Sequence, residues 1–152
     1  MDAELNSLID AVRNAAAQGR TLRLRGGGTK DFWGPSLTGD VLDTRAYRGI
    51  VSYEPSELVV TVRCGTPLTE LEAALAEQGQ CLAFEPPHFG EGATVGGMVA
   101  SGLSGPARAT AGAVRDYVLG ARFINGLGEH LTFGGQVMKN VAGYDVSRLM
   151  AG

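Results

Sequence analysis

The sequence predicts an α+β fold, because helical and strand patterns both occur and their order differs between the two halves of the chain. Residues 1–85 give a helix, several strands, a second helix and a return strand, which favours a small layer with a partly parallel sheet. Residues 86–152 give a proline-rich loop, a short glycine-rich helix and a β-hairpin. At 152 residues the chain is long enough for one domain.

The first predicted element is an amphipathic helix over residues 3–18. Asp2 is placed to cap its start, and Gly19 is placed to end it in a left-handed conformation. Short strands are expected to follow this helix. The apolar helix positions are Leu5, Leu8, Ile9, Val12 and Ala16, and the strands are expected at residues 22–25, 41–43, 49–53 and 58–63.

A second helix is predicted to begin at Pro67, since proline suits the first helical position, and to end before Gly79. Thr66 is expected to cap this helix with its hydroxyl group. Residues 81–84 are then predicted to return as a strand. The inward face of the helix is expected to consist of Leu68, Leu71, Ala74 and Leu75.

The second half opens with a loop at residues 85–92, which is extended because a residue before proline is pushed out of the α region. Thr94 is expected to cap a short helix over residues 95–101. The Asn-Gly pair at residues 125–126 predicts a hairpin turn. The flanking strands are expected at residues 117–124 and 129–133, small-residue loops at 102–112 and 134–143, and a last helical turn at 146–150 behind Asp145.

Charge and composition exclude several classes of function. Lys and Arg number 13 against 16 Asp and Glu, without a basic run, so nucleic acid is not an expected partner. No apolar run approaches the ~20 residues of a membrane helix, and the acidic N-terminus lacks the features of a secretory signal. Cys64 and Cys81 are expected to be buried reduced thiols. We therefore expect a cytoplasmic protein without a direct membrane span.

Glycine is unusually frequent, at 23 of 152 residues, or about twice its usual share of ~7%. Three consecutive glycines at residues 26–28 precede Thr29, Lys30 and Asp31. Successive main-chain N–H groups in such a turn can form a nest for an anion, although a ligand-free tight turn is an equally good interpretation. The loop is not a Rossmann fingerprint, because Asp31 stands where the third glycine belongs, and it lacks the Gly-Lys-Ser/Thr of a Walker A loop.

A second glycine-rich element, residues 92–97, lies at the start of the predicted short helix. Free N–H groups and the positive end of the helix dipole favour an anion there. The alternative is a helix that packs closely on another backbone through Gly96 and Gly97. Two such turns, far apart in the chain, could hold the two sides of one diphosphate. A hydrolase or phosphotransferase is less favoured, because no Ser/Cys–His pair or paired acids occur in a recognisable motif.

Four motifs follow one another along the chain, at residues 25–31, 93–102, 115–120 and 139–149. Together they resemble the FAD-binding domain of the vanillyl-alcohol-oxidase (PCMH-type) flavoproteins, the group that includes the FAD-binding subunits of bacterial glycolate oxidases. The resemblance runs from about residue 5 to the end of the sequence.

The resemblance implies a two-subdomain, PCMH-type α+β fold with FAD between the subdomains. Residues 1–85 would form the first subdomain, with the diphosphate loop, and residues 86–152 an incomplete second one. Family members continue past the position of Gly152, so we expect the chain to be C-terminally truncated and name no catalytic residue. The positions that would contact FAD are Gly26, Gly27, Gly28, Thr29, Lys30, Asp31, Pro86, Pro87, Gly92, Thr94, Gly96, Gly97, Ser101, Gly102 and Gly105.

The same resemblance implies how the cofactor is held. Relatives that attach flavin covalently through the first loop have a histidine there, whereas this sequence has Thr29 and Lys30. Noncovalent FAD is therefore expected. Two other residues each allow two interpretations: His88 could touch the ring edge or be a solvated loop residue, and Trp33 could cover the cofactor or pack the loop.

The activity implied is that of an FAD-binding module in a flavin-dependent 2-hydroxy-acid (glycolate) oxidase or dehydrogenase complex. Its substrate would be a small 2-hydroxy acid, and its partners a second flavoprotein subunit and an iron–sulfur subunit. The resemblance also allows the assembly to rest on the inner face of the membrane. The alternative is a non-catalytic flavin-fold subunit kept for assembly. No metal site is expected, because His130 beside Glu129 has no companion ligands.

Overall fold

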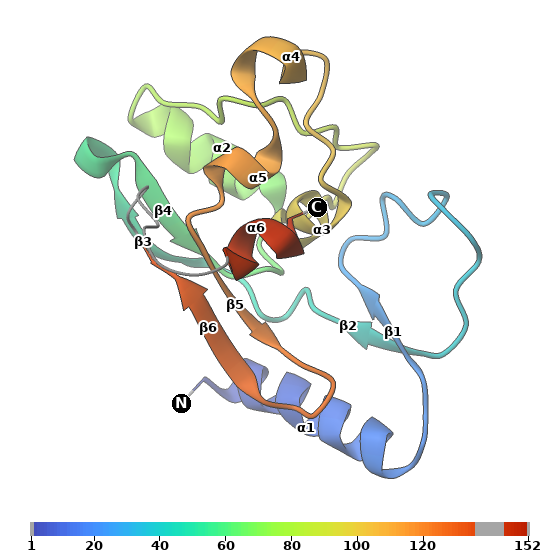
Figure 1. Cartoon of the computed structure of the whole chain (residues 1–152). Helices are drawn as coiled ribbons and strands as arrows, with labels where there is room; N and C mark the ends of the chain where they lie inside the picture. Colours follow the sequence, from blue (N-terminus) through green and yellow to red (C-terminus); the bar gives the residue numbers. More distant parts are fainter. Residues whose placement is uncertain (1, 136–144, 152) are drawn as a thin grey trace.

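The computed structural model describes residues 2–135 and 145–151, which form a mixed fold of helices and strands (Figure 1). This confirms the predicted α+β class. Residues 136–144, which include part of the fourth motif and most of the predicted loop before Asp145, lie outside the described residues. The elements are α1 (Ala3–Ala17), β1 (Leu22–Arg25), β2 (Asp40–Asp43), β3 (Ile50–Glu54), the 3₁₀ turn η1 (Pro55–Glu57), β4 (Val59–Val62), α2 (Leu68–Glu77), α3 (Val95–Ser101), α4 (Arg108–Ala111), α5 (Val114–Tyr117), β5 (Gly120–Ile124), β6 (His130–Gly134) and α6 (Val146–Met150).

The described strands pair as three two-stranded sheets. β1 and β2 run parallel, as the first half of the sequence predicts, and Leu24 lies opposite Leu42. β3 pairs antiparallel with β4, and β5 with β6 in the predicted hairpin. The first glycine loop leaves the carboxyl end of β1, so the parallel pair fixes where that loop starts.

Helix α1 begins and ends within one residue of the prediction and lies beside the turn of the β5–β6 hairpin (Figure 1). The Asp2 side chain accepts an N–H of the first turn at 3.3 Å, and Gly19 follows the helix with φ +63°. Leu5 and Ala15 are buried, whereas Ala16, which was expected on the inward face, is exposed. A spacing of three or four residues from Val12 allows either alanine on the inward face, and the structure buries Ala15.

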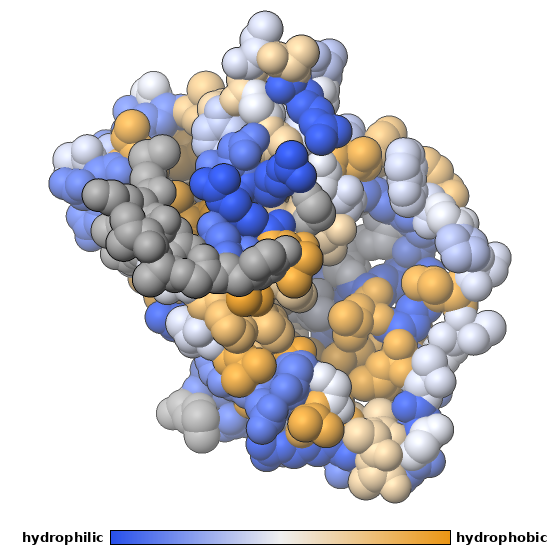
Figure 2. Space-filling model, in the orientation of Figure 1, coloured by the Kyte–Doolittle hydropathy of each residue, from blue (hydrophilic) through white to orange (hydrophobic). Residues whose placement is uncertain are grey.

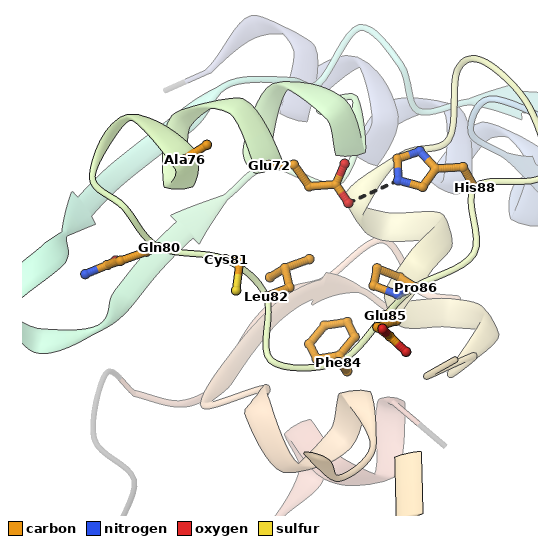
Figure 3. A pocket seen from close by; sticks show the side chains of 9 residues that line it. All are labelled: Glu72, Ala76, Gln80, Cys81, Leu82, Phe84, Glu85, Pro86 and His88. Atoms are coloured by element: carbon orange, nitrogen blue, oxygen red, sulfur yellow. Dashed lines mark hydrogen bonds and ion pairs between the residues drawn. The ribbon is translucent and has the colours of Figure 1, made fainter. Parts of the chain in front are cut away.

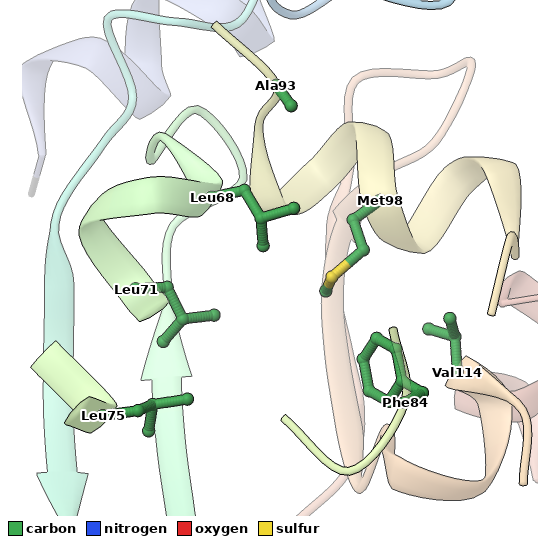
Figure 4. Packing of buried hydrophobic residues seen from close by; sticks show 7 residues of the cluster. All are labelled: Leu68, Leu71, Leu75, Phe84, Ala93, Met98 and Val114. Atoms are coloured by element: carbon green, nitrogen blue, oxygen red, sulfur yellow. The ribbon is translucent and has the colours of Figure 1, made fainter. Parts of the chain in front are cut away.

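The hydrophobic core lies where α2, α3 and α5 converge (Figure 4). Each buried leucine of α2 contributes about 1.5–3 kcal/mol relative to an exposed one, so these side chains fix α2 to the rest of the fold. Ala74, also expected inward, is only half-buried. The core contains residues from both sides of position 85. The division into two subdomains at that position stays a prediction. The cluster consists of Leu68, Leu71, Leu75, Phe84, Ala93, Met98 and Val114.

Thr66 does not cap α2, contrary to the prediction. Its side chain is fully buried, and its hydroxyl accepts the N–H of Gly49 at 2.8 Å and lies 3.3 Å from the Gly49 carbonyl oxygen. Pro67 occupies the N-cap position without a side-chain hydrogen bond. The Thr66 hydroxyl thus joins the start of β3 to the start of α2, a tertiary contact that a local capping rule does not contain.

Residues 81–84 are not a strand, which corrects a second prediction. Phe84 turns its ring into the core, and Pro86 and Pro87 directly after this segment have no N–H groups to continue a ladder. The short helix α4 lies in a segment predicted as loop, and α5 ends at Tyr117, the residue at which a strand is predicted to begin. Asp116 stabilises α5 by accepting the N–H of Ala113 at 2.9 Å, so β5 begins only at Gly120.

The two cysteines have different environments. Cys64 is half-buried against α3, and burial raises the pKa of its thiol. Cys81 is exposed, so the expectation of a buried thiol is wrong at that position.

Candidate functional site

The two glycine loops lie in direct contact. A Cβ added to Gly27 would overlap the carbonyl oxygen of Gly92 and lie 3.3 Å from the nitrogen of Ala93. A Cβ on Gly26 would lie 2.5 Å from Oγ1 of Thr94. Only bare backbone permits so close an approach. The fold therefore brings together the two turns that the sequence predicts to share a diphosphate.

The first loop presents unbonded main-chain donors. The N–H groups of residues 26–30 donate to no acceptor within residues 2–135 and 145–151, whereas the N–H of Asp31 bonds to the Gly28 carbonyl at 3.2 Å. Residues 26–30 are each half-buried. Gly28 has φ +72°, and a left-handed residue within such a turn makes successive N–H groups converge. This backbone arrangement is typical of an anion-binding nest.

Asp31 closes the loop through two arginines of β1. Its Oδ2 accepts from Nε and Nη2 of Arg25 at 2.9 and 2.8 Å, and its Oδ1 lies 3.2 Å from Nη2 of Arg23. The hydrogen bond from Arg25, followed by the charges of both arginines, lowers the pKa of Asp31. Sequence reasoning missed both arginines as partners of Asp31. Their spacing of two residues, which puts them on one face of a strand, was the available signal.

Aromatic side chains join the outer edges of the two loops. The ring centroids of Phe32 and Phe89 lie 5.3 Å apart at 80°, and those of Phe32 and Trp33 6.4 Å apart at 74°. Nζ of Lys30 lies 6.0 Å from the centroid of Phe89, and burial lowers the pKa of Lys30. Trp33 packs edge-on against Phe32 but remains 61% exposed. The first loop is thus held to the second by rings as well as by backbone.

The first turn of α3 has no free main-chain donors, so the prediction of free N–H groups there is wrong. The N–H groups of Val95 and Gly96 bond to main-chain carbonyls just before α2, at 2.9 and 2.8 Å. The N–H of Gly97 bonds to the hydroxyl of Thr94, the predicted N-cap, at 3.1 Å. A Cβ on Gly96 would lie 2.7 Å from Cβ of Cys64, as expected for a helix packed closely on another backbone. Contact of these residues with FAD stays a prediction.

The remaining predicted residues lie in two further places. Gly105, with φ +76°, packs on Glu85, the residue before Pro86. A Cβ added to Gly105 would lie 2.7 Å from the Cβ of Glu85. Ser101 ends α3 and donates its hydroxyl to a carbonyl of the same helix at 3.1 Å. Gly102 caps α3 in the left-handed conformation. These residues have evident structural roles, and their contact with a cofactor stays a prediction.

A pocket of about 450 Å³ lies between α2 and residues 80–88 (Figure 3). At its rim, Nε2 of His88 lies 3.0 Å from Oε1 of Glu72. His88 is therefore tied to α2. Of the predicted site residues, only Pro86 borders this pocket. It is lined by Glu72, Ala76, Gln80, Cys81, Leu82, Phe84, Glu85, Pro86 and His88.

The donor set of the first loop fits the diphosphate of a dinucleotide. Neutral N–H groups can bind an anion without a cluster of basic side chains, which suits the net charge of −3.

Apolar side chains gather on one face of the molecule, over β1–β2 and over the β5–β6 hairpin (Figure 2). Within the part of the chain that the structure describes, no three His, Cys, Asp or Glu side chains are grouped to hold a metal ion.

These features define a dinucleotide-binding domain of the flavoprotein type, and comparison with known families agrees. The family model described as "FAD binding domain" matches residues 3–146. The chain belongs to this FAD-binding domain family, and its cofactor is FAD.

Individual relatives show which members of the family the chain is similar to. The chain is 57% identical to the glycolate oxidase subunit GlcE of Escherichia coli over 146 residues, which are 96% of this chain and 42% of that protein. It is 35% identical to a D-lactate dehydrogenase of Archaeoglobus fulgidus over 85% of this chain and 29% of that protein. The chain thus spans less than half the length of these relatives. It carries the FAD-binding domain of a class of oxidoreductases.

Solved structures support the fold. The chain matches alkyldihydroxyacetonephosphate synthase with a TM-score of 0.70 and 22% sequence identity, over 96% of this chain and 28% of that one. At this identity the match bears on the fold alone. As for membranes, the described residues contain no helix with the length and apolar character needed to cross a bilayer.

Proposed function

We propose that this chain is the FAD-binding module of a flavin-dependent 2-hydroxy-acid oxidase or dehydrogenase, and that the whole protein acts on glycolate. The similarity to a glycolate oxidase subunit and to D-lactate dehydrogenases supports this substrate class, because glycolate and lactate are both 2-hydroxy acids. The observation that carries the proposal is the contact of Gly27 with Gly92. It sets the unbonded N–H groups of residues 26–30 beside the second glycine turn.

These N–H groups are numerous enough for useful affinity. A hydrogen bond from an N–H to a charged oxygen contributes about 1.5–3 kcal/mol. Four or five such bonds from residues 26–30 would therefore approach the ~8 kcal/mol of a micromolar complex, before the costs of association are subtracted. Lys30 adds a positive charge at the edge of the nest.

When bound, FAD supplies the redox chemistry by accepting a hydride from the substrate, and its electrons pass on to other subunits. The residues of this chain bind and orient the cofactor. Thr29 and Lys30 stand where relatives with covalent flavin have histidine, so we propose that FAD is held noncovalently. The proposed contacts remain Gly26, Gly27, Gly28, Thr29, Lys30, Asp31, Pro86, Pro87, Gly92, Thr94, Gly96, Gly97, Ser101, Gly102 and Gly105.

The proposal includes partners for the whole protein. The E. coli relative is named as a subunit of glycolate oxidase, and we infer that the whole protein works in a multisubunit assembly too. Its partners would be a second flavoprotein subunit and an iron–sulfur subunit, at the inner face of the membrane.

FAD titration tests the cofactor site. Trp33 is the single tryptophan of the chain and lies beside the first loop, so bound flavin should quench its fluorescence. We expect saturable one-to-one binding with a micromolar or lower Kd, confirmed by equilibrium dialysis. Acid precipitation should release all the FAD into the supernatant, as noncovalent binding requires. Absence of saturable binding would contradict the proposal.

The substrate is tested in the whole protein with its partner subunits. Glycolate should bleach the flavin absorbance faster than unrelated organic acids do. If the complex oxidises glycolate equally well when this subunit is emptied of FAD, the subunit serves assembly and the catalytic proposal is overturned.

A further inference from the structure

The first glycine loop needs an anchor that its own residues do not provide. Glycine loses more backbone entropy on ordering than any other residue, and residues 26–28 carry no side chains with which to hold a conformation. Within the described residues, the loop is fixed by contact with the second turn and by the groups at its two ends. At those ends stand Arg25 and Asp31.

We propose that Asp31 is a positioning residue for the dinucleotide: its carboxylate ties Arg23 and Arg25 together and holds residues 26–30 in the conformation that receives the diphosphate. This inference rests on the proposed function of the loop. It assigns the carboxylate of Asp31 an indirect role, exerted through the arginines and the backbone, in addition to the contact with FAD that is proposed above for this residue.

The geometry of the three side chains supports this role. Both oxygens of Asp31 are engaged, Oδ2 by Arg25 at 2.8–2.9 Å and Oδ1 by Arg23 at 3.2 Å. The guanidinium of Arg25 also packs against Gly28, where a Cβ would lie 2.9 Å from Nε. The Arg25–Asp31 pair therefore joins both ends of the loop, and the Arg25 side chain packs against Gly28, the left-handed residue of the loop.

The charges distinguish this role from direct electrostatics. If charge alone mattered, Asp31 would repel a diphosphate, and Arg25 would attract it. Removal of the carboxylate would then tighten binding. In the structure Nε and Nη2 of Arg25 are directed at Asp31, so the arginine is used to hold the loop. Removal of the carboxylate then weakens binding, which is the opposite sign.

Asp31→Asn tests the sign, because it removes the charge and keeps the shape. We expect the Kd for FAD to rise about three- to tenfold, the size expected for loss of a partly exposed ion-pair network. ADP, which carries the diphosphate without the flavin, should lose affinity by the same factor, and Asp31→Glu should recover part of it. The matched control is Asp40→Asn, which removes the Arg20–Asp40 pair at the other end of the same sheet and should leave both Kd values unchanged.

A double-mutant cycle isolates the pair. Arg25→Gln should weaken FAD binding in the wild-type background and add little in the Asp31→Asn background, because coupled residues are not additive. FAD binding by Asp31→Asn that is equal to or tighter than wild type overturns the inference and leaves the proposed function standing. A urea midpoint that falls far more for Asp31→Asn than for Asp40→Asn also overturns it, since Asp31 would then act through folding. Failure of the wild-type chain to bind FAD and ADP defeats the proposed function first.

Discussion

At the scale of single residues, Gly27 is the position where one methyl group tests the contact of the two loops. Its Cβ would overlap the Gly92 carbonyl oxygen, so Gly27→Ala must push the loops apart. We expect a loss of about 1–3 kcal/mol in the free energy of unfolding, as for other overpacked sites, and loss of FAD binding. Urea denaturation and Trp33 fluorescence measure the two effects.

Gly126→Ala is the matched control for Gly27→Ala. Gly126 lies in the hairpin turn, and no heavy atom lies within 4 Å of the position that its Cβ would take. Stability and FAD binding should both stay near wild type in this variant. Equal effects of the two substitutions would show that the contact with Gly92 does not matter.

At the scale of elements, Thr66 links β3 to α2, and its hydroxyl can be removed with little change of shape. Thr66→Val leaves the N–H and carbonyl of Gly49 without their partner. An unsatisfied, partly buried polar group costs about 1–3 kcal/mol, so we expect a loss in that range by urea denaturation. Thr110→Val removes an exposed hydroxyl in α4 and should change stability far less. If the two variants are equally stable, the link is not important.

The elements also show what local sequence signals contain. The ends of α1, the cap of α3 by Thr94 and the β5–β6 hairpin follow from residues within one turn of each boundary, and the sequence predicts them correctly. The segment at residues 81–84 has strand-like residues, but it pairs with no strand within residues 2–135 and 145–151. Whether a segment finds a pairing partner depends on the tertiary fold. The β-propensity of these residues alone therefore predicts a strand that does not form.

The candidate site shows the same limit. The sequence predicts two glycine turns at one ligand, and their contact through Gly27 and Gly92 confirms that they meet. The sequence does not reveal that the N–H groups of Val95 and Gly96, at the start of α3, are already hydrogen-bonded, because the acceptors are carbonyls that another segment supplies, such as that of Cys64. It also does not pair Asp31 with Arg23 and Arg25, since the loop must first fold back on β1.

At the scale of the whole molecule, the two turns should respond differently to FAD in hydrogen exchange. The N–H groups of residues 26–30 have no acceptor within the described residues, whereas those at the start of α3 are hydrogen-bonded. With labelling times of seconds, FAD should therefore lower deuterium uptake at residues 26–30 and leave the already protected residues 95–98 unchanged. The hairpin turn at residues 125–128 serves as the internal reference and should show no change.

Longer labelling reports the stability of the whole fold. FAD at 100 times its Kd stabilises the folded state by about 2.7 kcal/mol. Core amides of α2, which we expect to exchange through global unfolding, should therefore exchange more slowly as well. If FAD lowered deuterium uptake at residues 95–98 within seconds and left residues 26–30 unchanged, the diphosphate would have to bind at the start of α3. In that case the hydrogen bonds from Val95 and Gly96 to the protein would have to break when FAD binds, and the first loop would be a structural turn.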